Sequence, residues 1–286
     1  METATSTRQM EVPIPTPDGT TTTLGTTGAG PRGITVDADG NVYTSNLDAS
    51  TVSKITPDGT STIVGTTGLK PRGIAVDTDG NVYTANTDSE TVSKITPAGA
   101  STIFGTTGNA PVAIAIDVNG NVYTANVDSD TVSKITAGGI STILGVTGSG
   151  PVDITVDADG NVYTANQASD DVSKIAPDGT TTTLGTTGAG PRGIALDAAG
   201  NIYTANRATD NVSKITAGGI STILGVTGSG PRGIAVDADG NVYTSSTSSN
   251  TLSKITDTST ATFAATGDTS PITIAGLTND TEYLMS

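Results

Sequence analysis

Hydrophobic and polar positions alternate along the chain in short runs, and the whole pattern returns every 40 residues. The tyrosine of the motif NVYT or NIYT marks this period. Its six copies are Tyr43, Tyr83, Tyr123, Tyr163, Tyr203 and Tyr243. A fixed period of this length indicates a solenoid, a propeller or another repeat array.

Each repeat contains four runs rich in Val, Ile, Thr and Tyr, separated by clusters of Gly, Pro, Asn and Asp. Such runs predict strands joined by tight turns. In the first repeat the predicted strands lie near residues 32–37, 41–46, 51–56 and 60–66. A lone four-stranded sheet would expose both faces, whereas radial stacking into a ring buries them and leaves only short edges. The sequence therefore predicts an all-β, six-bladed β-propeller of 40-residue four-stranded repeats.

The two ends of the chain bear on how the ring closes. Residues 16–30 nearly duplicate residues 176–190, so the chain starts near the third or fourth strand of a repeat. The sixth repeat supplies only its first three strands, which end at Thr256. We expect a strand at about residues 19–26 to complete that blade and close the ring.

A seventh blade built from both termini is the alternative. Pro271 and Tyr283 keep the 40-residue period, but their segment lacks the repeated aspartate and the Gly-Asn turn. Pro13 and Pro15 would also remove hydrogen-bond donors from a central strand. We therefore favour six blades. The predicted organisation is a leader over residues 1–15, a propeller over residues 16–256 and an extension over residues 257–286.

The phrase P-x-G-I-A-V-D-x-x-G-N-V-Y, as in Pro71 to Tyr83, resembles the NHL-type β-propeller repeat of bacterial surface and enzyme-associated proteins. The resemblance covers about residues 16–256, with six copies in order. It implies the fold, whereas the functions of the family are too diverse to transfer. Residues 257–286 resemble the later strands of a fibronectin type III domain, and a degenerate blade is the other interpretation.

Composition narrows the function classes. The formal net charge of −15 disfavours nucleic acid or an anionic membrane surface as a partner. We also expect no membrane span, because no run of 18 apolar residues occurs. The first ten residues contain no apolar signal region. An acidic chain that lacks Cys and is rich in Thr, Gly and Asn nevertheless favours a secreted or cell-surface protein.

Catalysis and metal binding are not expected from the residue types. The chain contains neither His nor Cys, which removes the commonest general base and the commonest soft metal ligand. The box Asp37-Ala38-Asp39-Gly40-Asn41 has carboxylates at alternate positions, but its glycine comes too early for a calcium loop. We interpret the box as a hairpin turn in which Asp caps its own backbone. No metal or other cofactor is therefore predicted.

Two charged positions are present in all six repeats and indicate a shared structural environment. One position is an aspartate and the other is a lysine. Packing of the lysine stem between sheets, with the ammonium paired to a carboxylate or exposed, would explain the repeated lysine. The aspartates are Asp37, Asp77, Asp117, Asp157, Asp197 and Asp237, and the lysines are Lys54, Lys94, Lys134, Lys174, Lys214 and Lys254.

The position after the repeated proline is more informative because it varies. It is occupied by Arg32, Arg72, Val112, Val152, Arg192 and Arg232. In a ring of the NHL type this position lies near the mouth of the central channel, and the turn after the second strand opens on the same face. That turn contributes Asn46, Asn86, Asn126, Asn166 and Asn206, followed in three repeats by Asp48, Asp88 and Asp128. Arginines among such groups are suited to a carboxylate, phosphate or sugar.

Three functions remain open. The favoured one is a non-catalytic structural or protein-interaction scaffold that self-assembles through exchange of terminal strands, as in a filament. The second is a binding module for a small anionic or peptidic ligand at the Arg and Asn face. The third is a propeller lyase or hydrolase, against which the missing histidine counts most.

Overall fold

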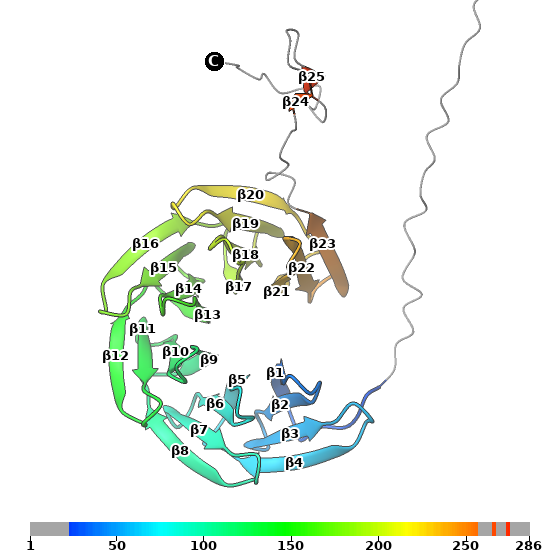
Figure 1. The fold of residues 1–286 in the computed structure, drawn as a ribbon, viewed down its shortest axis with the longest axis vertical. Coiled ribbons are helices and arrows are strands. Elements are labelled where there is room, and N and C mark those ends of the chain that lie inside the picture. The colour runs from blue at the N-terminus through cyan, green and yellow to red at the C-terminus, as the bar shows by residue number, and fades with distance from the viewer. Residues whose placement is uncertain (1–22, 257–264, 267–272, 275–286) are drawn as a thin grey trace, which may run out of the picture.

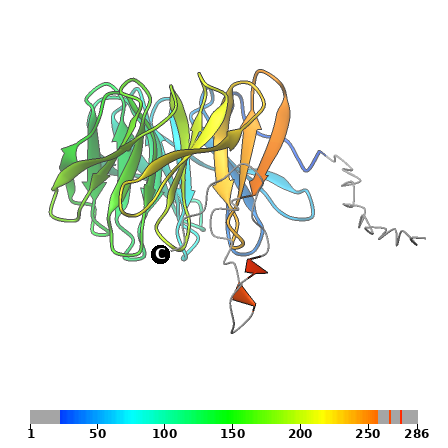
Figure 2. The same ribbon diagram turned by 90° about the horizontal axis from the view of Figure 1, so that it is seen from above.

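The computed structural model describes residues 23–256, 265–266 and 273–274. Within these ranges the chain forms antiparallel sheets arranged around a central axis (Figure 1). Figure 2 shows the blades side by side, with their turns on two opposite faces. No helix in the described ranges is long and apolar enough to cross a membrane.

The sheets follow the repeats, and in each one the strands lie in chain order from the channel outwards (Figure 1). Blade 1 comprises β1 (Pro31–Val36), β2 (Val42–Asn46), β3 (Thr51–Ile55) and β4 (Ser61–Thr66). Blade 2 comprises β5 (Pro71–Val76), β6 (Val82–Asn86), β7 (Thr91–Ile95) and β8 (Ser101–Thr106). Blade 3 comprises β9 (Pro111–Ile116), β10 (Val122–Asn126), β11 (Thr131–Ile135) and β12 (Ser141–Val146).

The second half of the ring repeats this order. Blade 4 comprises β13 (Pro151–Val156), β14 (Val162–Asn166), β15 (Asp171–Ile175) and β16 (Thr181–Thr186). Blade 5 comprises β17 (Pro191–Leu196), β18 (Ile202–Asn206), β19 (Asn211–Ile215) and β20 (Ser221–Val226). Blade 6 comprises β21 (Pro231–Val236), β22 (Asn241–Ser246) and β23 (Thr251–Thr256), and β24 (Ala265–Thr266) pairs with β25 (Thr273–Ile274).

These sheets confirm the predicted all-β propeller with six blades. The strands of blade 1 begin and end within one residue of the predicted ranges. Most of the predicted closing strand at residues 19–26 lies outside the described residues, and residues 23–26 are not in a strand. The leader and most of the extension also lie outside the described residues.

The repeated aspartate caps the first hairpin of its blade. In blade 3, Oδ1 of Asp117 accepts hydrogen bonds from the backbone N–H groups of Asn119 and Asn121, each at 2.9 Å. Oδ2 accepts from Nδ2 of Asn121 at 2.7 Å and from the phenol of Tyr123 at 2.9 Å. Burial opposes ionisation of Asp117, but these hydrogen bonds outweigh it and lower the pKa of the carboxyl group. The predicted hairpin turn is confirmed.

The repeated lysine has a different partner from the predicted carboxylate. Tyr123 and Lys134 are directly opposite each other on β10 and β11. The Lys134 ammonium lies 5.6 Å from the centroid of the Tyr123 ring, which is a cation–π distance. Because the tyrosine hydroxyl donates to Asp117, the ring stands between the two charges of the blade. The Lys54 ammonium lies in the same way, 5.5 Å from the Tyr43 centroid.

The hydrophobic core is divided among the interfaces between blades. Tyr43 and Val52 of blade 1 form one cluster with Ile74, Val82 and Ile95 of blade 2. Equivalent clusters recur around the ring. Small β-branched side chains are sufficient for this thin layer, which explains how a chain with only 3 % aromatic residues forms a core.

The facing sides of blades 1 and 6, here called the seam, lack such a partner among the described residues. Ile34 of β1 is 69 % exposed, whereas its counterpart Ile74 is 8 % exposed. Leu252 of β23 is 73 % exposed, whereas its counterpart Val52 is fully buried. In Figure 1 the two blades face each other where the ring would close.

Candidate active site

A cavity of about 540 Å³ lies where the innermost strands of all six blades begin, and we call it the channel mouth. The position after the repeated proline contributes a side chain from every blade. These side chains are Arg32, Arg72, Val112, Val152, Arg192 and Arg232. The predicted gathering of the arginines around the channel is therefore present in the structure.

The guanidinium groups converge without carboxylate partners among the described residues. The Nε atoms of Arg72, Arg192 and Arg232 are buried and have no hydrogen-bond partner within the described part of the chain. Partial burial and the charges of neighbouring arginines, Arg232 and Arg207 foremost, lower the pKa of the Arg192 guanidinium. In a protein of net charge −15, such a local cluster of positive charge focuses attraction for anions on the channel.

Asp153 places a carboxylate in the wall of the same cavity. Its Oδ1 accepts a 3.0 Å hydrogen bond from the N–H of Ile154, and its Oδ2 accepts a 2.9 Å hydrogen bond from the N–H of Ile194 on blade 5. Removal from bulk water raises the pKa of this carboxyl group to about 6, although the two hydrogen bonds oppose the shift. A carboxyl group with this pKa can both accept and return a proton near neutral pH.

A side chain at the position of Asp153 is unusual because the innermost strands approach closely there. The counterpart in blade 1 is Gly33, where an added Cβ would lie 2.4 Å from the carbonyl oxygen of Arg72. Glycine is therefore required at that contact. In blade 4 the aspartate side chain instead links β13 to β17 through its hydrogen bond to Ile194.

The cavity has two chemically different sides. Blades 1, 2, 5 and 6 contribute arginine, and we call this side the arginine half. Blades 3 and 4 contribute the valine half, which lies opposite the seam (Figure 1). Its apolar lining residues are Val112, Ala113, Ile114, Val127 and Val152. Gln167, from the loop after β14, adds a polar amide.

The predicted asparagines are not brought together with the arginines. In blade 3, Nδ2 of Asn126 donates to Thr131 at 3.1 Å and to Ser133 at 2.9 Å, and Oδ1 accepts from Thr124 at 2.9 Å. The set is completely buried inside the blades, where it fixes the end of the second strand. Its members are Asn46, Asn86, Asn126, Asn166 and Asn206.

The predicted aspartates lie on exposed loops of the same face, outside the residues that line the channel mouth. Asp48 forms an ion pair with Lys70 at 2.9 Å. Both side chains are well exposed, so the pair contributes little to stability. Asp88 and Asp128 occupy the corresponding exposed positions in blades 2 and 3.

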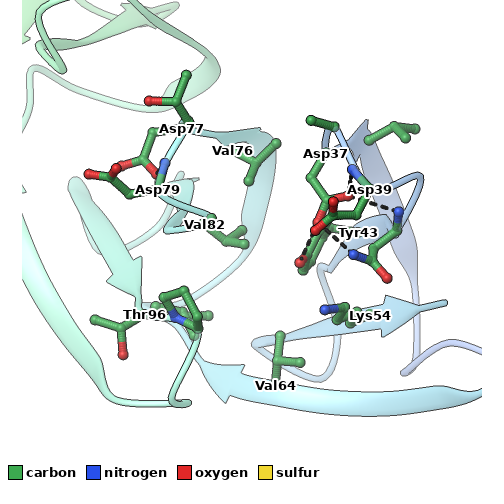
Figure 3. A pocket seen from close by; sticks show the side chains of 17 residues that line it. Asp37, Asp39, Tyr43, Lys54, Val64, Val76, Asp77, Asp79, Val82 and Thr96 are labelled. Atoms are coloured by element: carbon green, nitrogen blue, oxygen red, sulfur yellow. Dashed lines mark hydrogen bonds between the residues drawn. The ribbon is translucent and has the colours of Figure 1, made fainter.

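A second kind of cavity lies between blades on the opposite face. One, of about 500 Å³, is lined by Asp37, Asp39, Asp77 and Asp79 (Figure 3). Figure 3 shows Asp37 and Tyr43 within the hydrogen-bonded turn of blade 1. A similar cavity of about 510 Å³ lies between blades 2 and 3. Because these cavities repeat and Asp37 and Asp77 cap turns, we assign them to the blade architecture.

No group of three or more acidic side chains in the described ranges is arranged to hold a metal ion. The polar chemistry therefore concentrates at the channel mouth. Sequence reasoning found the arginines there but missed Asp153 and Gln167. The signal was available, because the counterparts of Asp153 are all small, namely Gly33, Gly73, Ala113, Gly193 and Gly233. A departure from the repeat marks the site better than the repeated residues do.

The chain matches the model of the virginiamycin B lyase family over residues 17–275. The protein belongs to the virginiamycin B lyase family. The match extends beyond Thr256, so the first part of the extension lies within the family model. No curated protein matches the chain.

Solved structures of similar proteins have the same fold. The selenomethionine-substituted virginiamycin B lyase from Staphylococcus aureus is 21 % identical, with a TM-score of 0.69 over 80 % of this chain and 84 % of that one. A catalytically inactive variant of that enzyme with quinupristin, in which alanine replaces a histidine, is 21 % identical, with a TM-score of 0.68 over 81 % of this chain and 85 % of that one. A gluconolactonase from Xanthomonas campestris is 14 % identical, with a TM-score of 0.60 over 82 % and 88 %.

Membership of this lyase family corrects the functional expectation. The favoured interpretation as a non-catalytic scaffold, and with it the expectation that the protein is not an enzyme, is wrong, because the family is one of lyases. The third interpretation, a propeller lyase or hydrolase, agrees better. The propeller part of the sequence resemblance is confirmed, whereas the comparisons give no support to a fibronectin type III segment.

Proposed function

We propose that the protein is a lyase whose active site is the channel mouth. The observation that carries this proposal is the presence of a carboxyl group with a pKa of about 6 and of arginines without carboxylate partners around one cavity. Membership of a lyase family supports it. We also propose that the repeats of this propeller are of the NHL type.

The two kinds of group suit the two halves of an elimination. In our proposal the ionised Asp153 removes a proton from carbon, and the released electron pair forms a carbon–carbon double bond. The bond from the adjacent carbon to oxygen breaks, and the leaving oxygen departs with its electron pair as an oxyanion. Arg192 and Arg232 bind the developing negative charge, which is where positive groups accelerate such a reaction. The proton then passes from Asp153 to solvent.

The absence of histidine makes Asp153 the central residue of this proposal. The inactive enzyme variant from S. aureus has alanine in place of a histidine. This chain contains no histidine, so proton transfer has to use another side chain. Asp153 is suited to the task because general bases work best with a pKa near the working pH.

Mass spectrometry tests the activity. We would incubate the full chain with quinupristin and with virginiamycin B, because the names of the similar solved structures contain these two compounds. Elimination adds no water, so the products together keep the mass of the substrate and gain a double bond. Hydrolysis would instead add one water. If neither kind of product forms, the proposal is overturned for these substrates. If the hydrolysis products form, the proposed elimination is overturned.

Variants test the assignment of residues. Asp153→Asn should lower kcat by roughly 10²-fold to 10⁴-fold, the usual contribution of a general base. Asp159→Asn is the matched control, because Asp159 lies on an exposed turn of the same blade. If Asp153→Asn turns over substrate as fast as Asp159→Asn, Asp153 is not the base.

A further inference from the structure

Blade 6 departs from the other five at the end of its second strand. The second strand of blades 1 to 5 ends in a buried asparagine, such as Asn126, whereas β22 ends in Ser246. In blade 3 the carboxamide accepts a 2.9 Å hydrogen bond from Thr124 and donates to Thr131 and Ser133 at 3.1 and 2.9 Å. Serine has no carboxamide, so these hydrogen bonds have no equivalent in blade 6.

Blade 6 nevertheless keeps the hydroxyl groups that surround this position. Thr244 of β22 is directly opposite Ser253 of β23. Ser246 is directly opposite Thr251 in the same way. Opposite side chains lie on one face of a sheet, as do side chains two residues apart on a strand. The hydroxyl groups of these residues therefore gather at one place on the blade.

Two of these hydroxyl groups are buried without a partner. Thr244 is fully buried and Ser246 is 4 % exposed. Neither hydroxyl oxygen has a hydrogen-bond partner among the described residues. A buried hydroxyl group that forms no hydrogen bond costs free energy, and such groups in native proteins are usually satisfied by another residue or by ordered water. A small ligand that can both donate and accept hydrogen bonds is therefore favoured here.

The site lies between blades 5 and 6, away from the seam. Val242, on the same strand, belongs to a hydrophobic cluster with Tyr203 and Val212 of blade 5. Thr244 and Ser246 follow Val242 at intervals of two residues, so they face blade 5 as well. The site is thus part of an interface that the described residues of two blades complete.

The loop that enters blade 6 covers this site. The N–H of Gly228 donates to the hydroxyl of Ser253 at 3.1 Å. A Cβ added at Gly228 would lie 3.2 Å from the Cβ of Ser246, so the backbone passes directly over the serine. Because a carboxamide is larger than a hydroxyl group, the exchange of asparagine for serine under this cover leaves room for about one water molecule.

We propose that blade 6 binds a structural water molecule in the place that the asparagine carboxamide takes in the other blades. The water accepts hydrogen bonds from the hydroxyl groups of Thr244 and Ser246 and donates to those of Thr251 and Ser253. Buried waters in proteins typically form about three such bonds. The groups around it are uncharged, which suits a neutral ligand. Binding at this site is independent of the proposed lyase function.

A crystal structure of the full chain, at a resolution that shows ordered water, tests the site directly. We expect a water molecule within hydrogen-bond distance of the hydroxyl groups of Thr244 and Ser246. The proposal is overturned if no water is found there, or if a side chain from outside the described residues takes its place.

Exchange of serine and asparagine tests the site in solution. Ser246→Asn should displace the water, restore the carboxamide network and raise the midpoint of thermal unfolding by about 2–4 °C, because the released water regains its freedom. Asn126→Ser is the matched reverse variant. It should lower the midpoint, and its crystal structure should show a water in place of the carboxamide. A lower midpoint for Ser246→Asn would mean that the site does not fit a carboxamide, and would count against the proposal.

Removal of a hydroxyl group distinguishes a hydrated site from a dry one by the sign of its effect. If the water is bound, Ser246→Ala and Thr244→Val each remove one of its partners and should lower the midpoint of thermal unfolding. If the site is dry, each variant removes an unpaired buried hydroxyl group and should raise the midpoint. A rise for either variant would therefore overturn the proposal.

Discussion

The carboxylate of Asp153 on β13 accepts a 2.9 Å hydrogen bond from the backbone N–H of Ile194 on β17, so that a side chain joins two neighbouring blades. The bond orients the carboxylate within the wall of the channel mouth. Both the hydrogen bond and the burial of the carboxylate depend on an aspartate at this position, where the other blades have glycine or alanine.

The first prediction concerns stability and pH. Burial raises the pKa of Asp153 from 3.8 to about 6, so the fold favours the protonated form. The corresponding stability is fully present below pH 4 and is lost as the pH rises through 6. Relative to Asp153→Asn, the protein should therefore lose up to about 3 kcal/mol of unfolding free energy between pH 4 and 7. Urea denaturation of both proteins across this range measures the difference, and parallel curves would contradict the assignment.

The second prediction concerns activity and pH. If Asp153 acts as the base, kcat/KM should rise with pH to a plateau, with a midpoint near 6, because only the ionised form accepts a proton. The profile of a substrate turned over by the full chain gives this midpoint directly. A rate that falls as pH increases through 6 would mean that the protonated carboxyl group is the active form.

The third prediction separates the blade network from the active site. Tyr123→Phe removes the phenol that donates to Asp117 at 2.9 Å and leaves the ring in place beneath Lys134. We expect a loss of about 1–2 kcal/mol in unfolding free energy, typical of a hydrogen bond to a charged acceptor. Binding at the channel mouth should not change, since Tyr123 does not line that cavity. Urea denaturation of the variant and its KM in the lyase assay test both statements, and a changed KM with unchanged stability would refute them.

The sequence predicts the features that recur in every 40-residue repeat better than those that depend on tertiary contacts. The strands of blade 1 follow from alternating Val, Ile, Thr and Tyr, because period-two alternation places one side chain on each face of a sheet. The buried asparagines are harder to predict. Asparagine is typical of turns, but the side chain of Asn126 is buried and forms hydrogen bonds with Thr131 and Ser133. Burial of a polar side chain depends on tertiary partners, which local pattern does not contain.

At the channel mouth, departures from the repeat are more informative than the repeated residues. Variation between the repeats indicates Arg192, and the same criterion applied to the next position indicates Asp153, which stands where other blades have glycine or alanine. The raised pKa of Asp153 comes from the closure of neighbouring blades around it, which spacing along the chain cannot supply. The missing histidine argues against a lyase in the sequence, but a carboxylate such as that of Asp153 offers a proton acceptor in its place.

The fourth prediction concerns backbone strain in the turn before β9. Ala110 has a φ of +53°, whereas Gly150 at the equivalent position has a φ of +67°. A left-handed conformation is unfavourable for a residue with a Cβ. Ala110→Gly should therefore stabilise the protein by about 0.5–1 kcal/mol, after allowing for the greater entropy of glycine in the unfolded chain. Thermal denaturation measures the change.

Ala125→Gly is the matched control for that substitution. Ala125 is completely buried in β10 and pairs with Val132, so glycine there loses packing as well as entropy. We expect this variant to be destabilised by about 1 kcal/mol or more. Stabilisation by both variants, or by neither, would show that backbone strain at Ala110 does not limit stability.

The fifth prediction concerns the seam and the ends of the chain. Ile34 and Leu252 are large apolar side chains that no described residue covers, and exposed apolar surface of this kind usually belongs to an interface. The expected closure of the ring by the ends of the chain would cover them. We therefore expect Ile34→Ala to cost about 1–2 kcal/mol in the full chain, but less than about 0.5 kcal/mol in a chain shortened to residues 23–256.

Ile74→Ala provides the scale for this comparison, because Ile74 occupies the same position in blade 2 and is buried. It should cost about 2–4 kcal/mol in both chains. A cost for Ile34→Ala below 0.5 kcal/mol in the full chain would contradict closure, since a covered isoleucine cannot be truncated so cheaply. If the shortened chain does not fold, closure is supported, because blades 1 to 6 are then not stable with the seam uncovered.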